Sequence, residues 1–162
     1  MTLSRSVKRT MGLLASMLST VALAASMNAP RQPVYFVAAD LRAGVARPQN
    51  GLAATLLPAG IRMQAFMVHR DAVGEVEMHA NAEHFYIAQA GEADVLLGRS
   101  VEGSHLIAPG EWRGGKILDG KPYRMKPGDV LWIPPGTAHQ VVVPVNGSFQ
   151  YIGLNADTKP TP

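Results

Sequence analysis

The sequence contains no cysteine. Disulfide bonds, thiolate nucleophiles, cysteine-ligated zinc and iron–sulfur clusters are therefore excluded. Charged residues are also scarce: they make up 17% of the 162 residues, against 47% for hydrophobic residues, which excludes disorder driven by an excess of charge. A chain of this length and composition predicts one globular domain.

The net charge of +3 says little about binding partners. Three of the 15 basic residues, Arg5, Lys8 and Arg9, lie in the first 24 residues, which hold no acidic residue. The 12 basic residues that remain balance the 12 acidic ones. The charge therefore gives no reason to expect binding to nucleic acid or to an anionic membrane.

Residues 1–24 predict a secretory signal peptide. The three basic residues precede an apolar stretch from Met11 to Leu23, and Ala22-Leu23-Ala24 supplies the small-x-small cleavage pattern. The alternative is an anchor helix, but this stretch has about 13 residues, fewer than the roughly 20 that span a bilayer. We expect cleavage after Ala24 or Ala25, and a mature protein in the periplasm or outside the cell that is free of the membrane.

The remaining chain predicts an all-β domain over residues 50–156. An extension with one short helix (within 37–46) precedes it, from residue 25 to 49, and a flexible tail (157–162) follows it. Short apolar or alternating runs end at Gly, Pro or Asn-Gly and predict strands at 52–57, 61–69, 74–79, 84–90, 93–98, 122–126, 129–133, 138–144 and 148–154. Many short strands at this spacing are typical of a β-sandwich or barrel. Residues 100–120 hold many glycines and predict a long loop or an irregular hairpin.

One motif near the C-terminus is specific. Gly128, Pro134, Gly136 and His139 follow one another with the spacing of the second motif of the cupin superfamily, which the sequence here resembles. A rigid Pro-Pro-Gly turn fixes where the next strand begins, so that the first inward position of that strand can hold a metal ligand at a reproducible depth. The resemblance covers residues 50–154 and implies a single-domain cupin β-barrel, a double-stranded β-helix or jelly roll.

The first cupin motif is matched with its donors permuted. Counting back from Gly91, the resemblance places His84 at the position of the family's Glu, and His79 and Glu77 at the positions of its two His. Strand alternation puts Glu77 and His79 on one face. A turn near residues 81–82 is expected to bring His84 back on the neighbouring strand.

The implied ligand set is His79, His84, His139 and Glu77, around one divalent transition metal. Iron, zinc, nickel, manganese and copper all suit these donors. An alternative register makes Glu83 the carboxylate ligand, and Glu77 has the further alternatives of a general base or a solvated carboxylate. Such a set leaves coordination positions open for chemistry.

Other residues are candidates for contact with a small-molecule substrate. His69 ends an alternating run and can lie at the barrel mouth, and Tyr86 shares the parity of His84, so that its hydroxyl is a candidate catalytic group. Arg62, Met67 and Trp132 are further candidates for substrate binding, although core packing is the alternative for Met67 and Trp132.

Two functions follow. The first is a metal-dependent enzyme acting on a small organic metabolite, as a dioxygenase with iron or as an isomerase or lyase with a Lewis-acid metal. The second is a non-catalytic cupin module that binds a small molecule or a metal. The apolar run 141–143 is predicted to lie near a sheet edge and favours a homodimer, because pairing covers an exposed edge.

Overall fold

The computed structural model describes residues 33–57 and 62–158. The predicted signal peptide lies outside the described residues, as do residues 159–162 of the predicted tail. The helix α2 (Ala38–Gly44) falls within the range in which a short helix was expected. Within the described ranges, no helix is long and apolar enough to cross a membrane.

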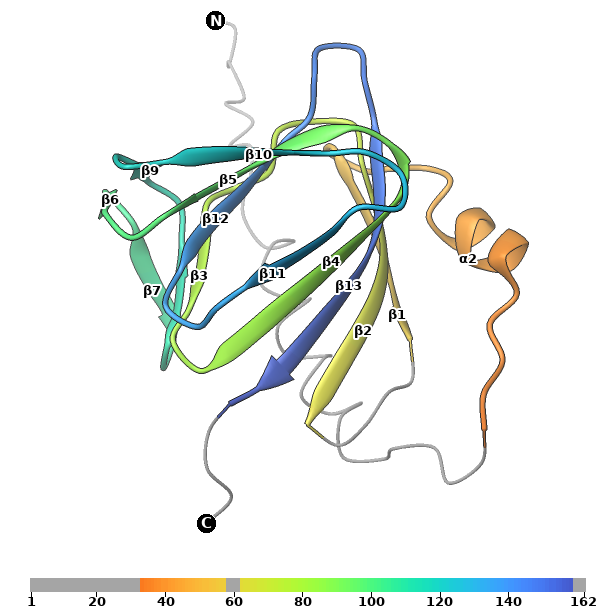
Figure 1. Ribbon diagram of the computed structural model, residues 1–162, viewed down its shortest axis with the longest axis horizontal. Coiled ribbons are helices and arrows are strands. Elements are labelled where there is room, and N and C mark those ends of the chain that lie inside the picture. Colours follow the sequence, from red (N-terminus) through yellow and green to blue (C-terminus); the bar gives the residue numbers. More distant parts are fainter. Residues whose placement is uncertain (1–32, 58–61, 159–162) are drawn as a thin grey trace, which may run out of the picture.

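Two antiparallel sheets face each other and form the body of the domain (Figure 1). The first has the order β1 (Leu52–Leu57), β2 (Met63–Arg70), β13 (Phe149–Asp157), β4 (Ala82–Gly91) and β11 (Val130–Ile133). The second has the order β10 (Lys121–Met125), β5 (Ala93–Gly98), β12 (Ala138–Val142), β3 (Glu77–His79), β8 (Glu111–Arg113) and β7 (His105–Ala108). A small third sheet pairs β6 (Val101–Glu102) with β9 (Lys116–Ile117). The prediction of an all-β jelly roll with one short helix is confirmed.

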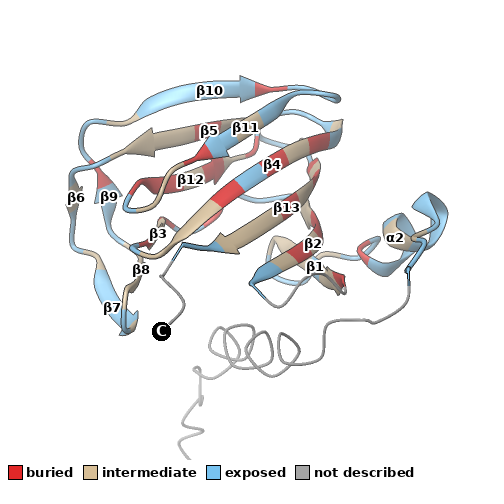
Figure 2. Cartoon of the chain, turned by 60° about the horizontal axis from the view of Figure 1, so that its bottom comes forward, coloured by how far each residue is buried: buried red, intermediate tan, exposed pale blue. Residues whose placement is uncertain are grey.

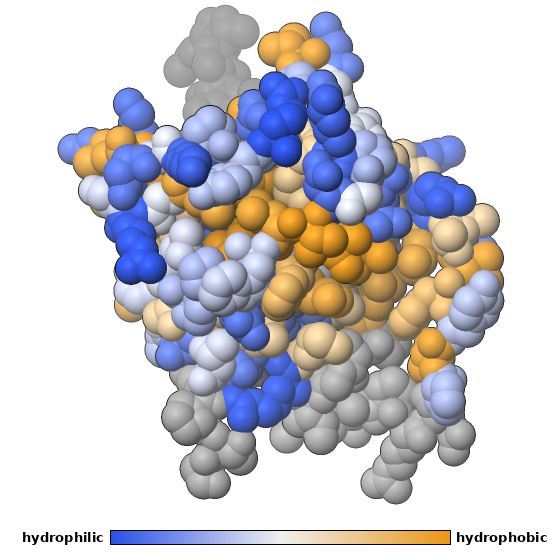
Figure 3. Space-filling view, in the orientation of Figure 1, coloured by the Kyte–Doolittle hydropathy of each residue, from blue (hydrophilic) through white to orange (hydrophobic). Residues whose placement is uncertain are grey.

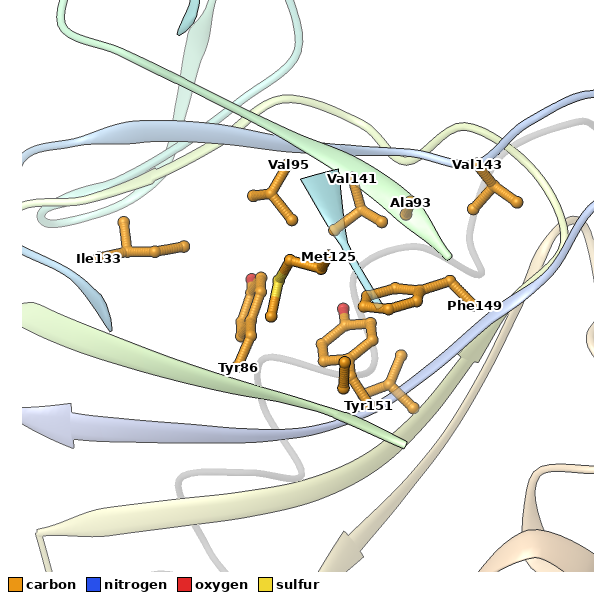
Figure 4. Packing of buried hydrophobic residues seen from close by; sticks show 11 residues of the cluster. Tyr86, Ala93, Val95, Met125, Ile133, Val141, Val143, Phe149 and Tyr151 are labelled. Carbon is orange, nitrogen blue, oxygen red and sulfur yellow. The ribbon is translucent and has the colours of Figure 1, made fainter. Parts of the chain in front are cut away.

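The core lies between the two larger sheets, because alternate residues of each strand point inward. Buried positions recur along β4, β13 and β12 in Figure 2. Figure 4 shows the aromatic rings of Tyr86, Phe149 and Tyr151 beside aliphatic side chains of the facing strands. The cluster also contains Val68, Ala88, Ala93, Val95, Met125, Ile133, Val141 and Val143.

Residues 100–120 are more regular than the sequence indicates. They contain the four short strands β6 to β9, and β8 joins the second sheet by pairing with β3. The irregular hairpin is right for β7 and β8, whose pairing shifts register between Leu106 and Ala108, but the long loop is wrong. Strands of two to four residues carry too little periodicity to be recognised from sequence.

The apolar run 141–143 does not lie at a sheet edge. Its strand β12 is an interior strand between β5 and β3, and Val141 and Val143 are buried in the core. The sequence basis for a homodimer is therefore wrong, because inward-facing valines of an interior strand are not available to a partner.

The glycines of the C-terminal motif have the backbone conformation that only glycine adopts without strain. Gly128 has φ of 94° and Gly136 has φ of 71°, both in the left-handed region. Gly136 also donates its N–H to the carbonyl of His79 over 2.8 Å. The Pro-Pro-Gly turn is thereby attached to the end of β3.

Candidate metal centre

Three histidines from three strands meet inside the domain. His79 (β3) and His139 (β12) come from the second sheet and His84 (β4) from the first, and their side chains are 8%, 2% and 3% exposed. Their ring centroids lie 4.5 to 5.4 Å apart. One nitrogen of each lies within 4.8 Å of the corresponding nitrogens of the other two. The sequence prediction that these three histidines converge is thus met by the structure.

The outer ring nitrogen of each histidine has an oxygen partner. His84 Nδ1 lies 2.7 Å from Asn155 Oδ1, and His139 Nδ1 lies 3.2 Å from the carbonyl oxygen of Thr137. His79 Nδ1 is hydrogen-bonded to Glu111 Oε2. These oxygens accept hydrogen bonds and do not donate, so each Nδ1 carries the hydrogen. Each neutral imidazole therefore presents an unprotonated Nε2.

The three Nε2 atoms have no hydrogen-bond partner although they are buried. A buried polar atom without a partner is costly, and three of them turned toward one another need an explanation. A metal ion supplies one, because it accepts the lone pairs of all three nitrogens. The residues present therefore fit a divalent transition metal.

Burial favours the neutral form of two of the three histidines, His84 and His139, because it lowers their pKa values. Desolvation, together with the charges of His139 and His79, lowers the pKa of His84 to about 3. Desolvation also lowers the pKa of His139 to about 4, against the opposing charge of Glu77. At His79 burial acts in the same sense, but the hydrogen bond to Glu111 and the negative charges of Glu111 and Glu77 outweigh it and raise the pKa. Two imidazoles are thus neutral at physiological pH without a metal.

Glu77 lies beside the histidines without joining their group. Among the described residues, the side chains whose ligand atoms all lie within 4.8 Å of one another are the three histidines alone. Glu77 Oε1 lies 3.4 Å from Arg70 Nη2, and Glu77 Oε2 lies 3.3 Å from Arg113 Nη2 and 3.6 Å from His79 Nε2. Burial opposes its ionisation, but the contact with His79 and the charges of the two arginines outweigh this and lower its pKa. A carboxylate held in this way is a weak general base.

Tyr86 lies beside the group of His79, His84 and His139, which we call the histidine triad, as predicted. Its ring makes edge contacts with His84 and His139, with centroid distances of 6.3 and 6.1 Å. Burial raises the pKa of its hydroxyl well above the ordinary value, with further contributions from Tyr151 and Glu77. Tyr86 is therefore a neutral hydrogen-bonding group, and its ring forms part of the wall of the site.

Four predicted substrate contacts lie elsewhere. His69 Nδ1 is 2.9 Å from the carbonyl oxygen of Val45, and Met67 shares the face of β2 with His69, opposite the core residue Val68. Arg62 donates to the carbonyl of Asp157 over 3.3 Å. Trp132 is 50% exposed, on the side of β11 opposite to the buried Ile133. The face of the molecule in Figure 3 carries apolar side chains near its middle. The structure brings none of the four to the triad.

The alternative carboxylate, Glu83, also points away from the histidines. Its Oε2 accepts a hydrogen bond from Trp132 Nε1 over 3.0 Å. His84 reaches the site by a route that differs from the prediction. Because β3 and β4 belong to different sheets, the turn after His79 crosses from one sheet to the other and does not lead to a neighbouring strand.

The residues that orient the three histidines were not predicted from the sequence. Glu111 falls within the predicted loop of residues 100–120, but it lies on β8, a paired strand of the second sheet, with His79 opposite Glu111. Asn155 lies opposite His84 in the pairing of β13 with β4. Both partners are fixed by strand register, and the sequence offered no signal that could have found them.

Comparisons with known proteins agree on the fold. The AraC-like ligand-binding domain family matches residues 114–158. A protein with a double-stranded β-helix domain from Klebsiella pneumoniae has a TM-score of 0.56 at 14% identity, covering 80% of this chain and 95% of its own. KdgF from Halomonas sp. has a TM-score of 0.53 at 18% identity, covering 78% and 96%. TT1209 from Thermus thermophilus has a TM-score of 0.55 at 17% identity, covering 73% and 94%. No curated protein matches the chain.

Proposed function

Because the chain has the cupin fold, a double-stranded β-helix, we propose that it is a mononuclear metalloenzyme acting on a small organic molecule. One observation carries the proposal: three buried histidines turn unpartnered Nε2 atoms toward one point. His79, His84 and His139 would hold the metal, which when bound supplies Lewis-acid chemistry or, with iron, redox chemistry. Iron favours a dioxygenase, and zinc, nickel or manganese favour an isomerase or lyase.

The chain's own residues contribute orientation and exclusion of water. Glu111, Asn155 and the Thr137 carbonyl fix the ring orientation of the three ligands. Tyr86 lies against two of the ligand rings and offers a neutral hydroxyl. The burial of the triad keeps bulk water away, so that a bound molecule meets these groups in a low-dielectric environment.

A non-catalytic binding module is the second candidate. The match of residues 114–158 to a ligand-binding domain family supports it, since that range includes β12 with His139. The two candidates share the site and differ in turnover. A protein that binds a metal and a small molecule but converts none of the molecules tested belongs to this second class.

We also propose that the protein is exported and acts in the periplasm or outside the cell. The basic and apolar pattern of residues 1–24 supports this proposal. Mass spectrometry of the protein from a periplasmic fraction is expected to show a chain that begins at Ala25 or Ser26. A full-length chain retained in the cytoplasm would contradict it.

Elemental analysis tests the metal site directly. The protein is purified without a His tag or chelator, beside a His79→Ala, His139→Ala double variant. A His105→Ala variant serves as the matched control, because His105 is exposed on β7. We expect about one equivalent of a transition metal in the wild type and the control, and none in the double variant. No metal in any of the three, even after reconstitution, would overturn the proposal.

The identity of the metal then selects the assays. Iron leads to measurements of oxygen consumption with small phenols, thiols and keto acids. Zinc, nickel or manganese lead to isomerase and lyase assays. Loss of turnover in the double variant, with activity retained in the His105→Ala control, supports the enzyme over the binding module.

A further inference from the structure

A closed set of ion pairs surrounds His79. Arg113, on β8, contacts two carboxylates: its Nη2 lies 3.3 Å from Glu77 Oε2 and its Nη1 lies 3.8 Å from Glu111 Oε2. Glu111 in turn holds His79 Nδ1. Strand pairing sets this arrangement, because Glu77 lies opposite Arg113 and His79 opposite Glu111 in the register of β3 and β8.

Arg70 reaches Glu77 from the opposite sheet. Its Nη2 lies 3.4 Å from Glu77 Oε1, and its Nε donates to the hydroxyl of Tyr151 over 3.4 Å. The side chain of Arg70 is only 12% exposed, and that of Arg113 is 19% exposed. Each oxygen of Glu77 therefore has a guanidinium partner of its own.

The same carboxylate is close to becoming a metal ligand. Glu77 Oε2 lies 3.6 Å from His79 Nε2, the nitrogen that would bind a metal. A metal held by the three histidines would attract this oxygen. If Glu77 Oε2 moved onto the metal, it would leave Arg113 Nη2, and Arg113 would keep only its longer contact of 3.8 Å with Glu111. Separating a largely buried guanidinium group from a carboxylate is costly in a protein interior. The two arginines and the metal thus compete for one carboxylate.

We propose that Arg70 and Arg113 withhold Glu77 from the metal and so keep one coordination position open for an external ligand. This inference rests on the proposed metal site. It assigns the two arginines as positioning residues that act through Glu77. A substrate with an anionic or carbonyl oxygen would then be able to bind a metal held there without first displacing an internal carboxylate.

Azide binding to the cobalt-substituted protein tests this inference. Co(II) is a visible probe of its own coordination, and azide is a small anion that occupies an open position. Purified wild-type protein is loaded with Co(II), the stoichiometry is measured, and azide is titrated while the absorption spectrum is recorded. The same titration is run on Arg113→Met, Arg113→Lys, Arg70→Met and the Arg113→Met, Glu77→Gln double variant.

We expect Arg113→Met to weaken azide binding by about tenfold or more, because the released carboxylate takes the open position. The double variant should return to the wild-type affinity, since glutamine is a poor metal ligand. The azide affinity of Arg113→Lys should fall between those of the wild type and Arg113→Met. Lysine keeps the positive charge, but it lacks the forked guanidinium group that contacts two carboxylates at once. Arg70→Met should act in the same direction as Arg113→Met while it leaves the Glu111 contact in place, so that a lost His79 orientation cannot mimic the effect.

Each outcome decides a separate point. Unchanged azide affinity in both methionine variants overturns the inference and leaves the metal site standing. Weak azide binding that the double variant does not restore also overturns it, because the lost arginine charge then accounts for the effect. A wild-type protein that binds no Co(II) overturns the proposed metal site, and with it this inference.

Discussion

The two sheets enclose two kinds of interior. Along β12 the inward side chains run from His139 to Val141, and along β4 they run from His84 through Tyr86 to Ala88. One end of the sandwich is therefore polar, with the histidine triad and its ion pairs, and the other is apolar around Phe149. The apolar end is stabilised by the burial of apolar surface, which needs no particular direction of contact, whereas the polar end depends on specific hydrogen bonds and ion pairs.

This difference predicts that the two ends fail in different ways. Replacing a large side chain at the apolar end with alanine should lower the free energy of unfolding and leave metal binding by the triad unchanged. A change at the polar end should weaken metal binding while it alters stability little.

Phe149→Ala should destabilise the protein by about 3–5 kcal/mol, because it opens a cavity beside Tyr151 in the apolar end. Urea denaturation followed by tryptophan fluorescence measures this loss. The protein that remains folded should bind Zn(II) as the wild type does. A loss below about 1 kcal/mol would show that the apolar end does not carry the stability of the domain.

Glu111→Ala should weaken Zn(II) binding by about 10–100-fold, because His79 loses the carboxylate that fixes its ring. Competition with a chelating dye measures the affinity. Glu102→Ala is the matched control, since Glu102 is an exposed carboxylate on β6. Equal affinity in both variants would mean that Glu111 does not orient the ligand.

Acidification should destabilise the metal-free protein. Burial lowers the pKa of His84 to about 3 and of His139 to about 4, so between these values and the unfolded value of about 6.5 the unfolded chain binds more protons. Stability is therefore lost as pH falls through this window. The raised pKa of His79 acts in the opposite sense and offsets part of the loss. We expect the melting temperature to fall by about 4 °C between about pH 7 and pH 5.

Replacing both His84 and His139 with glutamine should flatten this dependence, as differential scanning calorimetry over the same pH range would reveal. A melting temperature that rises on acidification in the metal-free wild type would show that His79 dominates the balance.

Glu83→Gln should change Zn(II) affinity by less than about twofold, because Glu83 faces Trp132 on the outer side of the sheet. The same dye competition measures it. A tenfold loss of Zn(II) affinity would instead support the register in which Glu83 is a ligand. That result would contradict the structure, in which Glu83 lies on the outer face of β4.

The sequence could predict what depends on local pattern. Alternation and turn residues were enough to place β1 and β5 at their observed ends. The motif that ends at His139 was enough to single out this residue. In the structure its turn is fixed, because Gly136 has a left-handed conformation and donates to the carbonyl of His79. Both signals lie within a few residues of the feature that they predict.

What could not be predicted depends on pairing between distant strands. Glu111 reaches His79 because β8 pairs with β3, and Arg70 reaches Glu77 because the two sheets face each other. His69 was expected near the triad because it alternates with Met67, but the face of β2 that carries both is opposite to Val68. Parity groups residues on one face without saying which face turns inward.

The triad combines histidines from both sheets, with His84 from one and His79 and His139 from the other. A metal held there would tie the two layers together across the interior. The chain has no cysteine, so it cannot form a disulfide cross-link. A bound metal would take the place of such a cross-link and would hold the two sheets together. Unlike a disulfide, this link could be removed by a chelator.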